Sequence, residues 1–241
     1  MILDRKKKVL ILGASSDIGL SVIKLFLKKN WEVYGHYNSN PSNLNKIKKQ
    51  FDKRLFLMKA DLSNQNSVKV FLKKIKKENI ISYINLVGYL DNKSFENFTI
   101  DSLVKTVKIN AIIPLFIQKE MTKKMIKQKF GRILNISSIG VKYGGSKFSF
   151  SYSFSKNSIE YFPKYLKDLT HKNILHNVLR VGVVNTKLLR KVKSKNIKKR
   201  VSLIPIKRMA SQEEIAKSIY NLASEENTYI SGEIITIAGG E

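Results

Sequence analysis

The sequence predicts an α/β fold, in which one doubly wound parallel sheet of about seven strands carries helices on both faces. Short apolar runs alternate along the chain with longer amphipathic segments, the pattern of a parallel sheet covered on both sides. A glycine-punctuated turn follows the first apolar run. A length of 241 residues suits one large α/β domain, so we expect residues 1–241 to form a single domain.

The elements follow in order from these runs. Strands are predicted where short stretches are rich in aliphatic and aromatic residues, at 8–12, 32–37, 55–59, 82–87, 132–137, 175–180 and 233–237. Helices are predicted where apolar residues recur at helical spacing, at 17–29, 68–77, 100–128, 152–170 and 212–223. In such a sheet the ligand site lies at the carboxyl ends of the strands.

The turn Gly13-Ala-Ser-Ser-Asp-Ile-Gly19 joins the first strand to the first helix. Gly13 lets the chain turn tightly, and Gly19 allows the helix to pack closely against the strand. The free amide groups at the start of that helix then face the pyrophosphate of a bound dinucleotide. The turn therefore predicts a Rossmann-type dinucleotide site, with an ordinary strand-to-helix turn as the structural alternative.

A Tyr-x-x-x-Lys spacing occurs three times, beginning at Tyr89, Tyr143 and Tyr152. In a chain this rich in lysine the spacing by itself means little. The second occurrence spans two adjacent glycines, which favours a loop. Only the third opens a predicted helix, on which Tyr152 and Lys156 lie one turn apart on the same face.

Tyr152, Lys156 and Ser138 together predict a carbonyl-reducing site. A phenol has a pKa of about 10, so Tyr152 needs a neighbouring positive charge to act near neutral pH. Lys156 and the positive ring of an oxidised nicotinamide supply it, and lowering the pKa by about 3 requires roughly 4 kcal/mol. Ser138, at the end of strand 132–137, can hold the substrate oxygen. Alternatively, Ser138 merely ends a strand and Tyr152 merely caps a helix.

The composition excludes several other classes of site. The chain has no cysteine and only 3 histidines, which are scattered, so we expect neither disulfides nor a metal site. Its longest apolar runs are far shorter than a membrane span, and residues 6–12 lead directly into the glycine turn, which is unlike a signal peptide. We therefore expect a cytoplasmic protein with no membrane partner.

The formal charge of +27 raises the question of nucleic-acid binding. The lysines are spread over nearly every predicted helix, which is typical of solvated helix faces, so no specific nucleic-acid partner is expected. One segment differs, because residues 186–208 hold ten basic residues and no acid. Its basic residues include Arg190, Lys191, Lys193, Lys198, Lys199 and Arg200. We interpret about 186–210 as a substrate loop able to recognise an anionic group.

These motifs resemble the short-chain dehydrogenase/reductase family along essentially the whole chain. In that family the turn is Thr-Gly-x-x-x-Gly-x-Gly, and the corresponding residues here are Leu12, Gly13, Asp17, Ile18 and Gly19. Leu12 and Asp17 depart from the pattern. Asp17 places a carboxylate near the expected pyrophosphate, unless its side chain caps the helix.

The resemblance also implies roles for other residues. Asn110 corresponds to the asparagine of a catalytic tetrad with Ser138, Tyr152 and Lys156, in which it holds a water in a proton relay to the lysine. Leu86 and Val181 depart from the family pattern. The implied cofactor-binding residues are Gly13, Ser15, Ser16, Asp17, Ile18, Gly19, Asn38, Ser39, Asp61, Leu62, Asn85, Gly88, Tyr152, Lys156, Gly182 and Thr186. Within this set, Asp61 and Leu62 would lie by the adenine and Thr186 by the nicotinamide carboxamide.

The end of the second strand bears on which nicotinamide dinucleotide is used. An NAD site typically has a carboxylate at the end of this strand that binds the ribose hydroxyls. The residues His36-Tyr37-Asn38-Ser39 include no carboxylate. Asn38, Ser39 and Ser16 can instead hydrogen-bond a 2′-phosphate, although no arginine is at hand for a bidentate contact. NADP(H) is therefore favoured over NAD(H).

The nearest group by resemblance is that of the 3-oxoacyl-acyl-carrier-protein reductases, which share a tail like that of residues 204–216. This implies an acyl-thioester substrate and acyl carrier protein as partner, docking on basic residues near the entrance of the site, which match Lys129 and Lys172. A sugar, polyol or small-ketone reductase of the same family is the main alternative. A non-catalytic dinucleotide-sensing protein and a nucleic-acid-binding module are alternatives of other classes.

The resemblance implies a homo-oligomer as well, a dimer or a tetramer. In the family, the helices that correspond to 111–128 and 152–170 pair into a four-helix interface. The first of these helices carries four charged residues, Lys119, Lys123, Lys124 and Lys127. They either lie on its solvent-exposed face or weaken that contact.

Overall fold

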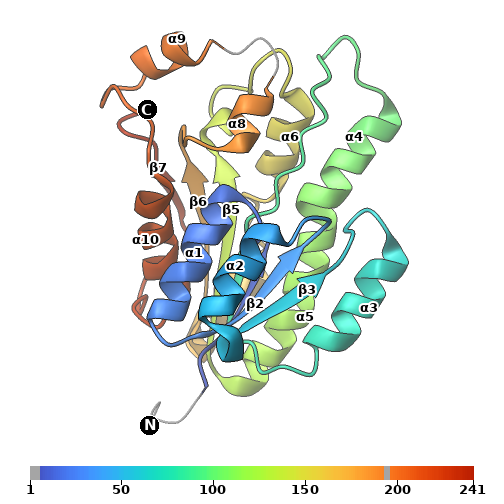
Figure 1. The fold of residues 1–241 in the computed structure, drawn as a ribbon, viewed down its shortest axis with the longest axis vertical. Helices are drawn as coiled ribbons and strands as arrows, with labels where there is room; N and C mark the ends of the chain where they lie inside the picture. The colour runs from blue at the N-terminus through green and yellow to red at the C-terminus, as the bar shows by residue number, and fades with distance from the viewer. Residues whose placement is uncertain (1–5, 193–195) are drawn as a thin grey trace.

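The computed structural model describes residues 6–192 and 196–241. Within these residues, seven parallel strands form one sheet in the order β3-β2-β1-β4-β5-β6-β7 (Figure 1). The strands are β1 (Lys8–Leu12), β2 (Glu32–Tyr37), β3 (Leu55–Lys59), β4 (Ser82–Asn85), β5 (Gly131–Ser138), β6 (Ile174–Val181) and β7 (Ile234–Ile237). The order turns back between β1 and β4, so the predicted doubly wound, Rossmann-type sheet is confirmed, with its topological switch point there.

Helices cover both faces of the sheet (Figure 1). On one face lie α1 (Asp17–Lys28), α2 (Ser42–Gln50) and α10 (Gln212–Ala223). On the other lie α3 (Gln65–Ile75), α4 (Ile100–Val107), α5 (Ile113–Gln128), α6 (Phe150–Ser158) and α7 (Lys164–Asp168). The short helices α8 (Lys187–Lys191) and α9 (Ile197–Ser202) lie beyond the carboxyl ends of β5 and β6. Single turns occur at η1 (Asp52–Arg54), η2 (Lys108–Ile112), η3 (Ile139–Val141) and η4 (Leu169–Lys172).

The core forms as two layers because each central strand buries both of its faces. In β1, Val9 and Ile11 pack with α1 and α10, whereas Leu10 and Leu12 pack with α3 and α5. All four side chains are fully buried. A strand with two buried faces needs a continuous apolar run, and this is why the short runs in the sequence mark the strands so well.

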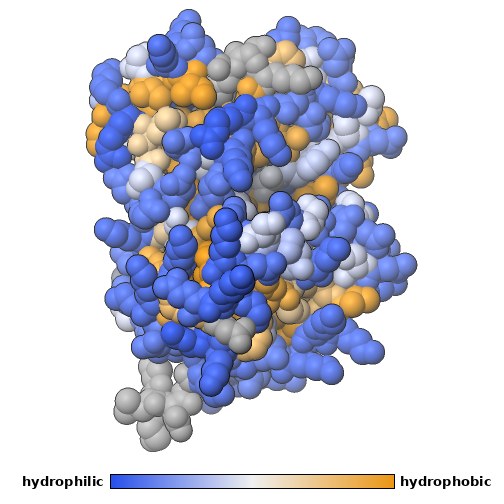
Figure 2. Space-filling model, in the orientation of Figure 1, coloured by the Kyte–Doolittle hydropathy of each residue, from blue (hydrophilic) through white to orange (hydrophobic). Residues whose placement is uncertain are grey.

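The high charge lies on solvated helix faces, as expected. Lys24 and Lys28 on α1 and Lys46 and Lys49 on α2 are exposed. Hydrophilic residues accordingly cover most of the face of the molecule shown in Figure 2. Within residues 6–192 and 196–241, Lys156 is the only buried lysine.

The predicted helix 100–128 is interrupted by the π-helical turn η2, in which Ile113 donates its amide hydrogen to the carbonyl of Lys108. Pro114 follows in the first turn of α5. In a regular α-helix residue 114 would donate to the carbonyl of Asn110, and proline has no N–H to donate. The proline therefore removes the α-helical partner of that carbonyl, and π-helical turns are frequent at functional sites.

The predicted helix 152–170 is wrong in its bounds. It begins earlier, as α6 at Phe150, and ends at Ser158; the chain becomes helical again only after Pro163, whose ψ is 135°. Proline disfavours helical backbone in the residue before it. In the same gap Glu160 turns inward and accepts a hydrogen bond from Arg180 Nε at 3.0 Å. This ion pair joins distant parts of the chain, so periodicity does not reveal it.

Several short helices lie outside the sequence-based expectation. In α2 only Leu44 and Ile47 are buried, and α8 and α9 bury no residue at all. Helices that bury so little surface leave a weak apolar period. The other element bounds agree with the expectation to within a few residues, and those of β1, β2, β3 and α10 agree completely.

Gly19 permits the closest approach between the glycine turn and α1. A Cβ atom at Gly19 would lie 2.6 Å from the carbonyl oxygen of Ala14 and 2.8 Å from that of Gly13. These are backbone atoms, which cannot move aside as a side chain can. We predict that Gly19→Ala lowers the free energy of unfolding by about 2 kcal/mol, measured by urea denaturation.

Gly35→Ala in β2 is the matched control, because the nearest atoms to its added Cβ are the side-chain atoms Ala14 Cβ at 3.3 Å and Ile23 Cδ1 at 3.6 Å. We expect a clearly smaller loss of stability from this substitution. Equal losses for the two variants would contradict the prediction.

Candidate active site

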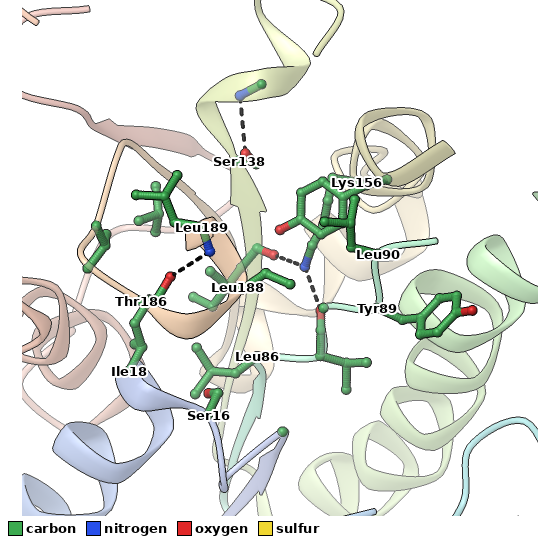
Figure 3. Close-up of a pocket in the computed structure, with 18 of the residues that line it drawn as sticks. Ser16, Ile18, Leu86, Tyr89, Leu90, Ser138, Lys156, Thr186, Leu188 and Leu189 are labelled. Atoms are coloured by element: carbon green, nitrogen blue, oxygen red, sulfur yellow. Dashed lines mark hydrogen bonds between the residues drawn. The ribbon is translucent and has the colours of Figure 1, made fainter. Parts of the chain in front are cut away.

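A cavity of about 700 Å³ opens at the carboxyl ends of the central strands. It brings together most of the residues that the sequence predicts for the site: Gly13, Ser15, Ser16, Asp17, Ile18, Asn38, Asp61, Leu62, Gly88, Ser138, Tyr152, Lys156, Gly182 and Thr186 all line it. The remaining predicted residues, Gly19, Ser39, Asn85 and Asn110, are not part of its lining. Figure 3 shows part of the lining.

The glycine turn forms one wall of this cavity. Gly13 has a φ of 73°, and a Cβ atom there would lie 2.9 Å from the backbone of Leu86, so the position requires glycine. Ser16 caps α1, since its hydroxyl oxygen accepts a hydrogen bond from the amide of Gly19 at 3.1 Å. The first amide groups of α1 have no acceptor within the helix, so they are available to an anion.

His36 supports the turn from below and was not predicted. Its Nδ1 accepts a hydrogen bond from the amide of Gly13 at 3.2 Å, so its Nε2 carries the hydrogen that faces the carbonyl oxygen of Ala60 at 3.0 Å. Burial lowers the pKa of His36 to about 4, which keeps the ring neutral in this tautomer. The only feature of the sequence that could have indicated this role of His36 is its position near the end of β2.

Asp17 does not cap its own helix, because the N-cap of α1 is Ser16. Its Oδ2 accepts a hydrogen bond from the backbone amide of Lys187, at 2.6 Å, across the mouth of the cavity. Lys187 is the first residue of α8, and Thr186 is the N-cap of that helix. The carboxylate that departs from the family pattern is therefore used to join the glycine turn to the substrate loop.

The far end of the cavity carries Asp61 and Asn38. The Oδ1 of Asp61 accepts hydrogen bonds from the amide and the hydroxyl of Ser63 at 2.8 and 2.7 Å, and these bonds lower the pKa of Asp61. Asn38 and Ser39 are both exposed just after β2. Ser39 lies outside the lining, so Asn38 and Ser16 are the better placed of the residues predicted to meet a 2′-phosphate.

Lys156 is buried at the centre of the site. Its Nζ donates to the carbonyl oxygens of Val87 at 2.7 Å and Ile136 at 2.6 Å, as Figure 3 shows. It lies 5.8 Å from the centre of the Tyr152 ring. Burial lowers the pKa of Lys156 to about 7. The ammonium group is thus held by two backbone carbonyls.

Tyr152 has its phenol at the cavity wall. Burial raises the pKa of Tyr152 to about 12, which is opposite to the lowering that the sequence suggested. The reason is that the expected lowering included the positive nicotinamide ring, whereas desolvation alone favours the neutral phenol. Ser138, at the end of β5, accepts a hydrogen bond from the amide of Gly140 at 3.1 Å, which leaves its hydroxyl hydrogen free to donate.

Asn110 lies behind the cavity wall, fully buried in η2. Its Oδ1 accepts from the amide of Tyr89 at 2.7 Å, and its Nδ2 donates to the carbonyl of Tyr89 and to the hydroxyl of Ser155, both at 2.9 Å. The Ser155 hydroxyl in turn donates to the carbonyl of Tyr152 at 2.7 Å. The side chain therefore ties the loop after β4 to α6.

Asn85, at the end of β4, has a similar supporting place. Its Oδ1 accepts a hydrogen bond from the amide of Val87 at 3.2 Å, and its Nδ2 donates to Asn135 at 3.3 Å. Gly182 lies against Ala238, where a Cβ atom would come within 2.6 Å of the Ala238 Cα. Both residues shape the backbone at the carboxyl end of the sheet, and of the two only Gly182 lines the cavity.

The rest of the cavity is lined largely by residues for which the sequence predicted no individual role in the site. They include the apolar side chains Leu90, Leu188 and Leu189 and the hydroxyl-bearing side chains Tyr143, Ser146, Ser149 and Ser153. Leu188 and Tyr152 converge on Gly88: a Cβ atom there would lie 3.3 Å from Leu188 Cδ2 and 3.6 Å from Tyr152 Cε2. Of the predicted loop 186–210, residues 193–195, including Lys193, lie outside the described residues.

Lys129 and Lys172 are not at the entrance of this cavity, contrary to expectation. Lys129 ends α5 immediately before β5, and Lys172 ends η4 immediately before β6. Both therefore lie at the amino ends of their strands, whereas the cavity opens at the carboxyl ends. The position of both lysines just before a strand already indicates the amino ends of a parallel sheet, so the expected place at the entrance depends on the resemblance alone.

The described residues contain neither a metal-ligand cluster nor a helix able to span a membrane. Across residues 6–192 and 196–241, no three His, Cys, Asp or Glu side chains come together as possible metal ligands. In the same part of the chain, no helix combines the length and apolarity needed to cross a bilayer.

The glycine turn at the switch point, together with a serine, a tyrosine and a lysine on one cavity, defines a class of nucleotide-dependent oxidoreductases. The comparison with protein families agrees, since residues 13–241 match the model described as enoyl-(acyl carrier protein) reductase. The chain belongs to the short-chain dehydrogenase/reductase family.

Individual relatives point the same way. The chain is 31% identical to 3-oxoacyl-acyl-carrier-protein reductase FabG of Buchnera aphidicola subsp. Schizaphis graminum, over 98% of this chain and 97% of that protein. Among solved structures, it is similar to YwfH, an NADPH-dependent reductase involved in bacilysin biosynthesis, with a TM-score of 0.87 and 25% identity over 98% of both chains. It is also similar to 4-hydroxyisoleucine dehydrogenase complexed with NADH, with a TM-score of 0.85 and 25% identity over 97% and 98% of the two chains.

The buried ammonium group of Lys156 should leave a signature in the pH dependence of stability. Burial lowers its pKa from 10.5 to about 7, so between these values the unfolded chain binds more protons than the folded protein. Stability then rises with pH over this window. We predict that the free energy of unfolding of the wild-type protein rises relative to that of Lys156→Met by on the order of 4 kcal/mol from pH 7 to pH 10.

Denaturant titrations across this pH range measure the difference. Lys69→Met, which removes an exposed lysine on α3, is the control and should show no such change relative to wild type. A difference between wild type and Lys156→Met that stays constant with pH would contradict the prediction.

Proposed function

We propose that the protein is an NADP(H)-preferring reductase that converts a carbonyl group to an alcohol, with Tyr152 as the general acid. The observation that supports this most directly is that Ser138, Tyr152 and Lys156 line one cavity together with the glycine turn. The residues proposed to hold the dinucleotide are Gly13, Ser15, Ser16, Ile18, Asn38, Asp61, Leu62, Gly88, Gly182 and Thr186. Asp17 is the one member of the turn whose charge opposes a pyrophosphate.

The chemistry follows from the protonation states of these side chains. When bound, the reduced dinucleotide supplies the hydride that adds to the carbonyl carbon. The Ser138 hydroxyl donates a hydrogen bond to the carbonyl oxygen, and the Tyr152 phenol transfers its proton to that oxygen as the charge develops. Burial raises the pKa of Tyr152 and so favours the protonated phenol, which is the form that a general acid needs.

After the transfer, the Tyr152 phenolate must be reprotonated. Lys156 lies one turn further along α6, and its positive charge stabilises the phenolate. Pro114 leaves the carbonyl of Asn110 without its α-helical donor, so this carbonyl is our candidate for holding a water that passes protons toward Lys156. In this proposal the Asn110 side chain has a positioning role.

The preference for NADP(H) rests on the end of β2. Asn38 is exposed at the cavity and Ser16 lies across from it at the start of α1, while the chain has no carboxylate at 36–39 to bind ribose hydroxyls. The relatives include both kinds of protein, since YwfH is described as NADPH-dependent and 4-hydroxyisoleucine dehydrogenase was solved with NADH.

We propose a 3-oxoacyl thioester as the substrate, carried by an acyl carrier protein. The Buchnera relative is a reductase of this kind, and the leucines at positions 90, 188 and 189 offer an apolar wall to an acyl chain. The hydroxyl groups of Ser146, Ser149 and Ser153 favour a second candidate, a sugar or polyol reductase, because such a substrate would pair with them. Action in the cytoplasm stays a prediction from the sequence.

We predict that Tyr152→Phe lowers kcat by about 10²–10⁴-fold, because the substitution removes the proton that the carbonyl oxygen needs. The assay follows absorbance of the reduced cofactor with 3-oxoacyl thioesters, ketoses and small diketones, first with NADPH and then with NADH. Cofactor affinity, measured by fluorescence titration, should remain close to that of the wild-type protein.

Tyr143→Phe is the matched control, since Tyr143 lines the same cavity and also has a lysine four residues later. It is expected to retain turnover. Full turnover by Tyr152→Phe would refute the mechanism, whereas cofactor binding without turnover of any substrate by the wild-type protein would support the dinucleotide-sensing alternative.

We further propose that the chain forms a homo-oligomer through α4, α5 and α6. Apolar side chains are exposed along these helices, namely Val104, Ile112, Leu115, Phe116 and Phe154, each at least 44% exposed. A row of this kind favours contact with a second copy. Because the chain leaves the helix at 159–163, this contact would use a shorter helix than the predicted 152–170.

We predict that Leu115→Glu shifts the protein toward the monomer, since a carboxylate would then be buried in the contact. Sedimentation velocity over a range of concentrations measures the shift. Leu203→Glu, at a leucine that is 65% exposed just after α9, should leave the assembly unchanged. The interface would be misplaced if both variants assemble like the wild-type protein.

A further inference from the structure

The contact between Asp17 and the start of α8 joins the glycine turn to a distant helix. Asp17 Oδ2 accepts the amide hydrogen of Lys187 at 2.6 Å, and the two residues lie 170 positions apart in the chain. In the glycine turn, Asp17 is the first residue of α1, and Lys187 is the first residue of α8. One carboxylate thus lies at the beginning of two helices, where negative charge is favoured.

This contact fixes a helix that covers the proposed reaction centre. Thr186 caps α8, because its hydroxyl oxygen accepts a hydrogen bond from the amide of Leu189 at 3.2 Å (Figure 3). The next residue after Lys187, Leu188, lies against Gly88 together with the Tyr152 ring. With α8 held at Asp17, Leu188 is therefore kept beside the Tyr152 ring on this side of the cavity.

The same carboxylate lies where a dinucleotide would place its phosphate groups. The amide groups of the first turn of α1 are without intrahelical acceptors and favour an anion. A pyrophosphate that approaches them comes close to the Asp17 carboxylate, and like charges repel each other. The bond to Lys187 and the approach of the pyrophosphate therefore compete.

We propose that Asp17 is a positioning residue that holds α8 in a closed position over the active site, and that the phosphate groups of the cofactor must displace this contact when they enter. The coupling to the cofactor rests on the dinucleotide site proposed above, whereas the closed position of α8 does not. In this view the departure from glycine couples occupation of the phosphate site to movement of the substrate-covering helix.

Substitutions on both sides of the bond test the closed state in the full-length protein without cofactor. Asp17→Ala removes the acceptor, while Asp17→Asn keeps an acceptor oxygen and removes the charge. Lys187→Pro removes the donor N–H at the first position of a helix, where proline is tolerated. The preceding residue, Thr186, has φ −131° and ψ 158°, which is compatible with a following proline.

The measurement is the rate of tryptic cleavage after Arg190 and Lys191, which are exposed at the end of α8. We expect cleavage about fivefold faster in Asp17→Ala and in Lys187→Pro, as loss of one exposed charge-assisted hydrogen bond implies. Asp17→Asn should be cleaved at close to the wild-type rate. The double variant should be cleaved no faster than either single one, because both remove the same bond.

Glu213→Ala is the matched control. Glu213 is also an acid in the first turn of a helix, and it accepts a hydrogen bond from Ser21 on α1 at 3.2 Å without touching α8. Its cleavage rate should equal that of the wild-type protein. Unchanged cleavage in both Asp17→Ala and Lys187→Pro would overturn the proposal.

Stopped-flow binding of NADPH tests the coupling. If α8 must be released, Asp17→Ala and Lys187→Pro should both bind NADPH faster, by about fivefold, although the proline variant retains the carboxylate charge. If charge repulsion alone were important, Asp17→Asn and Asp17→Ala would accelerate equally and Lys187→Pro would not, which would overturn the coupling. Failure of every variant and of the wild-type protein to bind NADPH would refute the proposed function, while the cleavage rates would still decide the closed state.

Discussion

The burial of the Lys156 ammonium group between two backbone carbonyls is the constraint on which the rest of the site depends. These carbonyls belong to Ile136 in β5 and to Val87 just after β4, so the lysine joins α6 to two neighbouring central strands. Removing a charge from water is costly, and the low pKa of Lys156 shows that the two hydrogen bonds offset this cost only in part. Tyr152, one turn earlier on the same helix, is thereby placed at the cavity wall.

A second constraint concerns the glycine turn, which has to serve two neighbours at once. On its inner side Gly13 approaches the backbone of Leu86 so closely that no side chain fits. On its outer side Asp17 reaches across the cavity to α8. The turn is therefore connected both to the central strands and to α8, which lies beside Tyr152. Under the proposed coupling, a change at the phosphate site would alter the position of α8 at the reaction centre.

The sequence predicted the framework well and the contacts of the site less well. The bounds of β1, β2 and β3 coincide with the predicted ones, because strands buried on both faces need continuous apolar runs. The helix at 152–170 was predicted too long, since apolar periodicity does not register Pro163 or the pairing of Glu160 with Arg180. Lys129 and Lys172 were expected at the entrance of the cavity. They lie at the amino ends of β5 and β6, whereas the cavity opens at the carboxyl ends.

By itself the sequence determined the doubly wound sheet, the family, and many of the residues that meet in the cavity, because these depend on local patterns and on spacing along the chain. Only the tertiary structure decided how those residues are paired. The partners of Lys156, the raised pKa of Tyr152 and the bond between Asp17 and Lys187 all depend on burial or on contacts between distant segments. Hydrogen bonds and desolvation depend on which groups lie close together in space. They therefore cannot be predicted from the residue type at one position of the chain.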